Sequence, residues 1–363
     1  MGANVYPRLV IDTGKLKVNA ERVIALCAEA GISVAGVVKV AAGDPKLARV
    51  VADAGAAQIA SSRLRQLVRI REAGVETPLM LIRIPMLSEA AAVVRAAEYS
   101  LNSDIEVLRA LNAAAGAAGV VHNVILMIEI GDLREGVWLE EEYIAIAREV
   151  EHELKNLSLA GTGTNVSCYG SIVPTPEKLA EFITATERVE NAVGREMGII
   201  SGSASTAFAR VIEGTMPKRV NHIRLGEAIF INRDNEDLHG LTVPGTYRDV
   251  MTLEAEVVEV RVKPSHPIGE IAYDAFRFQP TYEDRGNRRR AIIAVGKVDY
   301  AFSELLTPLE PGVTVLGASS DHTLLDVEDA AHEVRVGDIM KFELDYGAEV
   351  FLNSSEDIVK VYR

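Results

Sequence analysis

Between Ser33 and Leu225 the sequence repeats one unit, in which a short apolar run of strand-forming residues is followed by a longer segment with helical spacing. Strands are expected at 33–39, 57–60, 78–84, 99–102, 123–130, 157–161, 197–201 and 221–225. Helices between them are expected at 45–54, 62–73, 88–97, 104–115, 140–153, 175–193 and 205–213. Strands that are apolar along their length suit a parallel sheet buried on both faces, and right-handed crossovers can close such strands into a barrel. The repeat therefore predicts a (β/α)8 barrel.

The pattern changes beyond Ile231, where residues 253–262 alternate between apolar and polar and helical spacing nearly vanishes. Further strand-like runs lie at 291–295, 313–317, 338–344 and 358–362. Frequent prolines between these runs indicate a small domain of antiparallel hairpins. The fold class is thus α/β, with a (β/α)8 barrel over 12–232 followed by a C-terminal all-β domain over 240–363. That domain is also expected to take the N-terminal strand, within residues 1–11.

Composition and charge narrow the class of protein. The 363 residues are 48% hydrophobic, which is enough for one large core or two moderate ones, and they carry a formal net charge of −14. Such an acidic chain is not expected to bind nucleic acid, and its one basic cluster, Arg288–Arg290, is interpreted as a solvated loop. Cys27 and Cys168 give no disulfide framework, and the histidines form no metal motif. Without a signal peptide or a membrane-spanning run, the chain is expected to be cytoplasmic, with no membrane partner.

Lys39 ends the first barrel strand, just before the Asp44-Pro45 pair that begins the next helix. In parallel α/β folds the chemistry gathers at the carboxyl ends of the strands. A partly desolvated lysine there can act as a nucleophile or as a Schiff-base former. The alternative is a lysine whose side chain only reaches from a strand end to solvent.

Two later strand ends carry residues suited to an anion. The segment Ser201–Thr206 follows the seventh strand, and Arg224-Leu-Gly226-Glu227 follows the eighth. Phosphate groups commonly bind at these two places in such barrels. Small residues with N–H and hydroxyl groups at a helix start suit a phosphate, and Gly226 permits close backbone approach. A strand-end lysine together with such a phosphate cup is the combination that pyridoxal phosphate requires.

With these motifs the chain resembles the alanine-racemase-like (fold type III) pyridoxal-phosphate enzymes, and most closely their ornithine racemase branch. The segment Tyr6–Asp12 resembles the family's opening strand, and Val37-Val-Lys39 matches the lysine that holds the cofactor. Gly131-Asp-Leu-Arg134-Glu-Gly136 resembles the segment that carries a cofactor-binding arginine, and Ser319-Ser-Asp321-His322 a loop that reaches a neighbouring subunit's site. The resemblance covers nearly the whole chain and keeps the order of its motifs.

The resemblance implies pyridoxal 5'-phosphate as the cofactor, held covalently by Lys39. It implies that Arg134 meets the cofactor's phenolic oxygen and the substrate carboxylate, and that Arg224 faces the pyridine nitrogen. The other implied cofactor contacts are Asn165 at the ring and Ser205, Thr206, Gly226, Glu227 and Tyr346 at the phosphate. Ser320 and Asp321 are the implied substrate-binding residues of the neighbouring subunit's loop.

Four positions depart from the pattern of alanine racemases. The segment 40–45 lacks the Asn-Ala-Tyr-Gly that usually follows the lysine, so a phosphate-contacting tyrosine is lost. Asn165 stands where a histidine usually faces the ring, and Met127 stands where many relatives carry a carbamylated lysine. The usual Gly-Tyr-Ala-Asp-Gly around the second catalytic tyrosine is replaced by Gly269-Glu-Ile-Ala-Tyr273-Asp. These departures favour the ornithine branch.

The resemblance implies a racemase that interconverts the L and D forms of ornithine or a related basic amino acid. Racemisation needs a base on each face of the α-carbon. Lys39 is the expected base on one face, and Tyr273 from the partner subunit of a homodimer is expected on the other; a packed strand tyrosine is the alternative for Tyr273. Asp321 is the expected partner of the substrate's side-chain ammonium, because a desolvated ammonium needs a carboxylate.

Other functions stay open as alternatives. A broad-specificity racemase, or an alanine or serine racemase, would use the same residues. A basic amino-acid decarboxylase of the same family is disfavoured, because its Cys-Glu-Ser-Gly-Asp motif does not occur in the sequence. A non-catalytic pyridoxal-phosphate carrier is a lone barrel, and a metal-assisted aldolase needs clustered ligands, so both are disfavoured.

Overall fold

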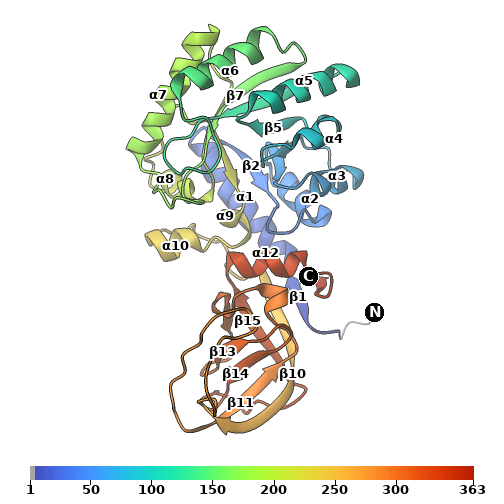
Figure 1. The fold of residues 1–363 in the computed structure, drawn as a ribbon, viewed down its shortest axis with the longest axis vertical. Coiled ribbons are helices and arrows are strands. Elements are labelled where there is room, and N and C mark those ends of the chain that lie inside the picture. The colour runs from blue at the N-terminus through green and yellow to red at the C-terminus, as the bar shows by residue number, and fades with distance from the viewer. Residues whose placement is uncertain (1–4) are drawn as a thin grey trace. The chain divides into compact units, whose positions relative to one another are not determined.

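The computed structural model describes residues 5–363, which fold into two compact units (Figure 1). One unit is Gly14–Arg248, and the other joins the described residues up to Thr13 to Asp249–Arg363. This division falls later in the chain than the expected start of the second domain at residue 240. Positions 1–4 of the expected segment 1–11 lie outside the described residues.

Within residues 5–363, eight parallel strands close into a barrel in chain order, with the last strand paired to the first. The strands are β2 (Ser33–Val37), β3 (Gln58–Ser61), β4 (Leu79–Leu81), β5 (Tyr99–Asn102), β6 (His122–Met127), β7 (Leu157–Thr164), β8 (Ile199–Gly202) and β9 (His222–Leu225). The helices are α1 (Thr13–Glu29), α2 (Pro45–Asp53), α3 (Leu64–Glu72), α4 (Ala90–Ala96), α5 (Ile105–Ala118), α6 (Glu140–His152), α7 (Pro176–Val193), α8 (Phe208–Ile212), α9 (Glu227–Phe230) and α10 (Asp234–His239). The predicted (β/α)8 barrel is confirmed.

Local capping sets where several of these helices begin. The Asp44 side chain accepts hydrogen bonds from the backbone N–H groups of Lys46 (2.9 Å) and Leu47 (3.2 Å), and Pro45 occupies the first turn of α2. The chain therefore turns sharply after β2. This turn places Lys39 in the connection between β2 and α2, at the carboxyl end of the strand. Three expected strands end earlier than predicted, since 33–39 reduces to β2, 78–84 to β4 and 123–130 to β6. The expected helix 205–213 begins as a 3-10 turn before α8.

The barrel strands contribute two kinds of buried side chain. Strands β2 to β6 supply an apolar cluster of Ala35, Val37, Ala60, Met80, Leu101, Ile125 and Met127. Strands β8 and β9 supply the buried polar residues Ser201, His222 and Arg224. His222 and Arg224 are two positions apart, so they share one face of β9. Buried polar groups need hydrogen-bond partners, which makes this part of the barrel a candidate site.

The second unit is a sheet in the order β12-β15-β10-β11-β14-β13, and β1 pairs with both β10 and β16. Its strands are β1 (Arg8–Ile11), β10 (Met251–Pro264), β11 (Asn287–Ile293), β12 (Leu306–Pro308), β13 (Thr314–Ala318), β14 (Thr323–Asp326), β15 (Ile339–Leu344) and β16 (Val359–Tyr362). The N-terminal strand lies antiparallel to β10 and parallel to β16. Its predicted place in the β domain is therefore confirmed. The unit is mostly rather than entirely β, because it includes helices α11 (Lys297–Tyr300) and α12 (Tyr346–Ser354).

The arginine run Arg288–Arg290 belongs to strand β11, so its interpretation as a solvated loop is wrong. Each arginine has an acceptor close by. Arg288 pairs with Asp326 of β14 at 2.9 Å, and Arg289 pairs with Glu333 at 3.3 Å. Arg290 donates to the Ser265 carbonyl at 2.6 Å. These partners on neighbouring segments allow the arginines to take part in the sheet.

Candidate active site

Lys39 is half-buried in a tight turn that follows β2. Its carbonyl accepts from the Ala42 N–H at 3.0 Å, and the Gly43 N–H donates to the Val38 carbonyl at 2.9 Å. Ala42 and Gly43 both have positive φ angles, of 50° and 65°. A turn that folds back over the strand end therefore holds the backbone of Lys39 in place.

Arg224 on β9 is the most deeply buried cation of the candidate site, with 4% of its surface exposed. Its Nη1 donates to the Ser201 hydroxyl at 2.5 Å, and its Nη2 donates to the Thr164 carbonyl at 2.8 Å and to Asn165 Oδ1 at 3.5 Å. Burial lowers the pKa of Arg224 to about 10, so the group stays protonated at neutral pH. All three acceptors are uncharged, so they leave the positive charge available to a ligand.

His222 lies on the same face of β9 and was not singled out from the sequence. Its Nδ1 is 2.9 Å from the Ser201 hydroxyl, and its Nε2 is 3.2 Å from Gln58 Oε1. Burial lowers the pKa of His222 to about 3, with a smaller contribution from the charge of Arg224. His222 is therefore neutral at physiological pH.

The two expected phosphate loops lie together. The Ser205 hydroxyl accepts from the N–H groups of Gly226 (3.2 Å) and Ala228 (3.3 Å). Thr206 donates its hydroxyl to the Val166 carbonyl at 3.3 Å. In the same loop Ser203 has a φ of 78°, a conformation that costs energy for a residue with a side chain. The sequence pattern did not indicate this strained position.

Gly226 and Glu227 have structural roles that sequence reasoning missed. A Cβ atom on Gly226 would lie 3.0 Å from the Val37 carbonyl oxygen, so the glycine permits β9 to pack closely on the end of β2. Glu227 Oε1 accepts from the backbone N–H groups of Arg233 (2.7 Å) and Asp234 (3.0 Å), at the start of α10. Burial raises the pKa of Glu227 to about 7, with a further contribution from the charge of Asp234. Its carboxyl group is thus engaged in holding α10.

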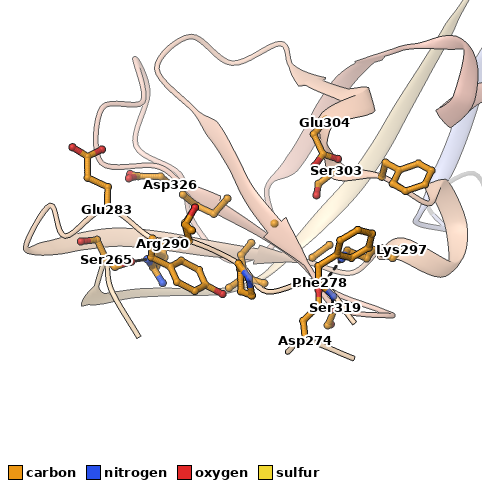
Figure 2. Close-up of a pocket in the computed structure, with 18 of the residues that line it drawn as sticks. Ser265, Asp274, Phe278, Glu283, Arg290, Lys297, Ser303, Glu304, Ser319 and Asp326 are labelled. Carbon is orange, nitrogen blue, oxygen red and sulfur yellow. Dashed lines mark hydrogen bonds and ion pairs between the residues drawn. The ribbon is translucent and has the colours of Figure 1, made fainter. Parts of the chain in front are cut away.

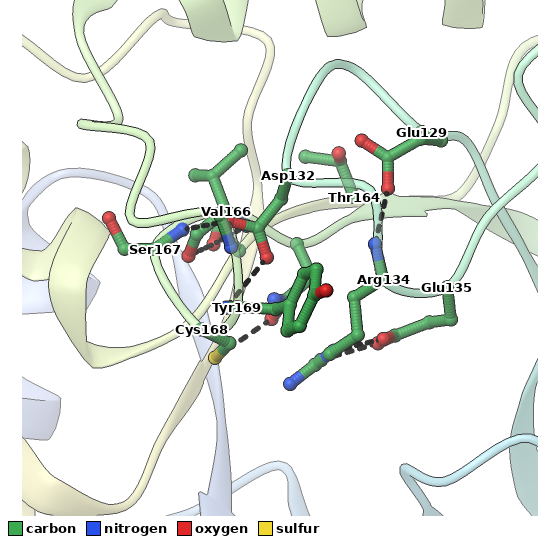
Figure 3. Close-up of polar contacts among 12 residues, drawn as sticks. Glu129, Asp132, Arg134, Glu135, Thr164, Val166, Ser167, Cys168 and Tyr169 are labelled. Atoms are coloured by element: carbon green, nitrogen blue, oxygen red, sulfur yellow. Dashed lines mark hydrogen bonds and ion pairs between the residues drawn. The ribbon is translucent and has the colours of Figure 1, made fainter.

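The loops after β6 and β7 are joined by a buried carboxylate (Figure 3). Asp132 accepts from the N–H groups of Ser167 (2.9 Å), Gly170 (3.0 Å) and Tyr169 (3.1 Å). A Cβ atom on Gly170 would lie 2.6 Å from the Asp132 carbonyl oxygen, so only glycine fits there. Asp132 therefore fixes the loop that carries Arg134 against the loop that carries Asn165.

Both the backbone and the side chain of Arg134 form polar contacts within that loop. Its N–H donates to Glu129 Oε2 at 3.2 Å, and its guanidinium forms an ion pair with Glu135 (Figure 3). Partial burial alone would lower the pKa of Arg134, but the hydrogen bond and charge of Glu135 outweigh it and raise the pKa. The charge of Glu135 raises the pKa of Arg224, and the charge of Arg134 lowers it.

Two residues that contact Arg224 also have a buried polar atom without a hydrogen-bond partner among residues 5–363, namely Asn165 at Nδ2 and Thr164 at Oγ1. Asn165 points its Oδ1 toward Arg224, so its NH2 group is turned elsewhere. A buried donor without an acceptor is costly. The pair indicates that a ligand with acceptor atoms belongs here.

The second unit carries Tyr273 in the connection between β10 and β11, with 71% of its surface exposed. The next residue, Asp274, organises that connection because it accepts from the N–H groups of Phe276 (2.8 Å) and Phe278 (2.9 Å). Lys297 pairs with Asp274 at 3.2 Å and lies 4.6 Å and 5.4 Å from the centroids of the Phe276 and Phe278 rings. Figure 2 shows Asp274, Phe278 and Lys297 at one end of a cavity of about 760 Å³ in this unit.

The remaining predicted residues also lie in the second unit. Ser320 and Asp321 form the turn between β13 and β14, where the Ser320 hydroxyl donates to the Asp321 carboxylate. Asp321 is exposed. Tyr346 is half-buried at the first position of α12. Among residues 5–363, no group of His, Cys, Asp and Glu side chains is arranged to hold a metal ion, and no helix is long and apolar enough to cross a membrane.

Comparison with known proteins decides the family. The model of the alanine racemase N-terminal domain matches residues 11–234. The chain belongs to the alanine racemase family. An ornithine racemase from Acetoanaerobium sticklandii is 36% identical over 356 residues, which cover 98% of this chain and 99% of that protein. A lysine racemase from Thermotoga maritima is 37% identical over 358 residues, which cover 99% of each chain.

A solved alanine racemase from Clostridium difficile 630 shares the fold of this family member. The TM-score is 0.75 at 17% identity, and the match covers 100% of this chain and 97% of that structure. The resemblance that the motifs indicated is confirmed.

Alanine racemase family members are pyridoxal-phosphate enzymes, and the barrel of this member suits that group. The buried guanidinium of Arg224 offers positive charge, and the unpartnered Asn165 Nδ2 offers a donor beside it. The hydroxyls of Ser205 and Thr206 lie at the joined loops after β8 and β9. Met127, at the end of β6, is fully buried.

Two buried histidines predict how stability depends on pH. The pKa is lowered by burial from 6.5 to about 3 for His222 and to about 4 for His122. Between these values and pH 6.5, each histidine binds a proton in the unfolded chain but not in the folded protein. The free energy of unfolding therefore falls as pH falls, by about 1.4 kcal/mol per pH unit for each histidine. Urea unfolding at pH 7 and pH 5 measures this difference. The variant His122→Asn should show a shallower dependence, and stability that does not fall from pH 7 to pH 5 would contradict the assignment.

Proposed function

We propose that the protein is a pyridoxal-phosphate-dependent racemase that interconverts the L and D forms of ornithine or lysine. The observation that carries this proposal is similarity over nearly the whole chain to an ornithine racemase and a lysine racemase. The buried cation Arg224, with unpartnered donors beside it in a family barrel, supports the choice of cofactor.

Residues of the barrel would hold the cofactor. Lys39 would bind it covalently at the end of β2, and Arg224 would meet the ring nitrogen. Ser205 and Thr206, with the backbone at Gly226 and Glu227, would contact the phosphate, together with Tyr346 of the second unit. Asn165 would donate its unpartnered NH2 group to the ring substituents, and Arg134 would pair with the phenolic oxygen and the substrate carboxylate. When bound, the cofactor delocalises the electron pair left at the α-carbon after proton removal.

The chain supplies the two bases. Lys39 Nζ would take or give the α-proton on one face, and the phenolic oxygen of the partner subunit's Tyr273 would do so on the other. The exposed position of Tyr273 and the anchoring of its neighbour Asp274 support this role. We therefore propose that the active unit is a homodimer whose sites are completed by the partner subunit.

Arg224 would govern which reaction follows proton removal. Its guanidinium stays protonated at neutral pH, and a cation beside the ring nitrogen disfavours a proton on that nitrogen. The ring is then a weaker electron sink, so the α-carbon is reprotonated rather than led into transamination.

Asp321 is the proposed partner of the substrate's side-chain ammonium, which makes it the specificity residue. The variant Asp321→Asn should lower kcat/KM for ornithine and lysine by about tenfold to a hundredfold, because a paired ammonium loses its counter-charge. The value for alanine, which has no such ammonium, should change by less than about twofold. Steady-state kinetics on the three substrates measure this. Equal losses on all three substrates would show a general structural role.

A chiral amino-acid screen tests the proposed function. The full-length protein, supplied with pyridoxal phosphate, is incubated with single L-amino acids, and the D products are measured by chiral chromatography. We expect D-ornithine or D-lysine to form faster than D-alanine or D-serine. Preference for alanine or serine would replace the substrate assignment, and release of carbon dioxide without a D product would indicate a decarboxylase.

A further inference from the structure

A chain of buried polar side chains runs across three barrel strands and ends at Arg224. Gln58 begins β3, His222 begins β9 and Ser201 lies in β8, with Ser201 paired in register with His222. Ala35 of β2 is the register partner of both Gln58 and Arg224. All four polar residues are buried, so each contact is made away from water.

The donor and the acceptor of each hydrogen bond in this chain of side chains can be assigned. Gln58 Oε1 only accepts, so the His222 Nε2 that faces it at 3.2 Å must carry a proton. Because His222 is neutral, its Nδ1 has no proton and accepts from the Ser201 hydroxyl at 2.9 Å. The Ser201 oxygen then presents its lone pairs to Arg224 Nη1, at 2.5 Å. Every hydrogen bond in the series has one donor and one acceptor.

We propose that Gln58, His222 and Ser201 are positioning residues that hold the Arg224 guanidinium in the orientation in which it meets the cofactor. This inference rests on the proposed function, in which Arg224 faces the ring nitrogen. Ser201 and the Thr164 carbonyl fix the two Nη atoms from different strands, β8 and β7. Because the acceptors are neutral, the guanidinium is oriented without being neutralised by a carboxylate.

The proposed positioning of Arg224 requires a neutral His222. A protonated His222 would donate from Nδ1 to the Ser201 oxygen, compete with Arg224 for its lone pairs and add a second positive charge nearby. Burial has the largest effect on the pKa of Arg224; the charges of Glu135 and Cys168 raise it, and the charge of Arg134 lowers it. Gln58, His222 and Ser201 are uncharged, so their role is to orient Arg224 and not to change its charge.

The barrel provides a matched control for the serine. Ser100 and His122 form a second buried pair, with Ser100 Oγ and His122 Nε2 2.8 Å apart. This pair also connects to Asn102, whose Nδ2 donates to Ser100 Oγ at 3.0 Å, and neither residue contacts Arg224. Ser201→Ala and Ser100→Ala thus each remove one buried hydroxyl that is bonded to a neutral histidine, but only the first reaches Arg224.

The first test is NMR of the holoenzyme with ¹⁵N-labelled histidine, which needs no catalytic turnover. We expect His222 to be the neutral Nε2–H tautomer throughout pH 6 to 8, and we expect Ser201→Ala to change its Nδ1 shift. A neutral Nδ1–H tautomer, or a protonated ring, would overturn the donor order. The NMR measurement tests the donor order even if the wild-type protein does not racemise ornithine and lysine. Failure to racemise them would count against the proposed function alone.

The second test is kinetic and uses the two serine variants. Ser201→Ala should lower kcat by about tenfold with KM changed by less than about twofold, and should raise the share of turnovers that end in transamination by about tenfold. Ser100→Ala should leave that share unchanged. Ser201→Thr, which keeps the hydroxyl, should restore the wild-type share. If the share is unchanged in Ser201→Ala, or rises equally in Ser100→Ala, the positioning role is wrong and the cluster only stabilises the barrel.

Discussion

The Lys39→Ala variant is expected to be purified colourless and to lose racemisation by about a thousandfold or more. Lys39 is the lysine placed in the turn after β2, and the same side chain is proposed to bind the cofactor and to act as a base. One substitution therefore removes both functions. The visible spectrum of the protein, with and without borohydride reduction, measures the first, and chiral chromatography measures the second.

Lys46→Ala is the matched control for this variant, since Lys46 is an exposed lysine in the first turn of α2. It should stay yellow and active. After borohydride reduction of the wild-type protein, the peptide that bears the cofactor should contain Lys39. Labelling at any other lysine, or a yellow and active Lys39→Ala protein, would contradict the assignment.

The Tyr273→Phe variant should racemise about a hundredfold to ten-thousandfold more slowly, because one face of the α-carbon loses its base. Lys39 remains on the opposite face. One enantiomer of the substrate should therefore still exchange its α-proton with solvent, while the other should not. Proton NMR of each enantiomer in D2O measures the two exchange rates separately.

Tyr282→Phe is the control, since Tyr282 is another exposed tyrosine of the same connection between β10 and β11. It should keep wild-type exchange of both enantiomers. Mixing inactive Lys39→Ala with inactive Tyr273→Phe should restore up to about a quarter of wild-type activity, because half of the random dimers hold one complete site. No recovery after proven subunit exchange would show that each site lies within one subunit.

The barrel was predictable because its signal is local. The strand 99–102 matches β5, and the expected helix at 175–193 differs from α7 by one residue, since apolar runs, capping residues and glycines alternate regularly there. In the second unit the signal is weaker. Helix α12 begins just after β15 and was missed. The arginines of β11 were not recognised as strand residues, because their ion pairs with Asp326 and Glu333 join segments far apart in the sequence.

The candidate site was predictable only in part. Lys39, Arg224 and the loop 201–206 stand at strand ends, where a barrel gathers its chemistry. His222 could also have been singled out from the sequence, because it lies two residues before Arg224 and therefore on the same face of β9. Gln58 had none, since its contact with His222 joins residues far apart in the sequence. The clamp made by Asp132 depends on loop backbone geometry, which sequence patterns do not specify.

The most direct test of the central claim follows the α-hydrogen of L-ornithine and L-lysine during conversion in D2O. A racemase with two bases should form the D enantiomer carrying deuterium at the α-carbon from the first turnovers, because the incoming proton comes from the base on the opposite face. The reaction should stop at a ratio of about 1:1 from either enantiomer, since the two have equal free energy. Early D product that retains the original hydrogen, or no D product from either amino acid, would contradict the account.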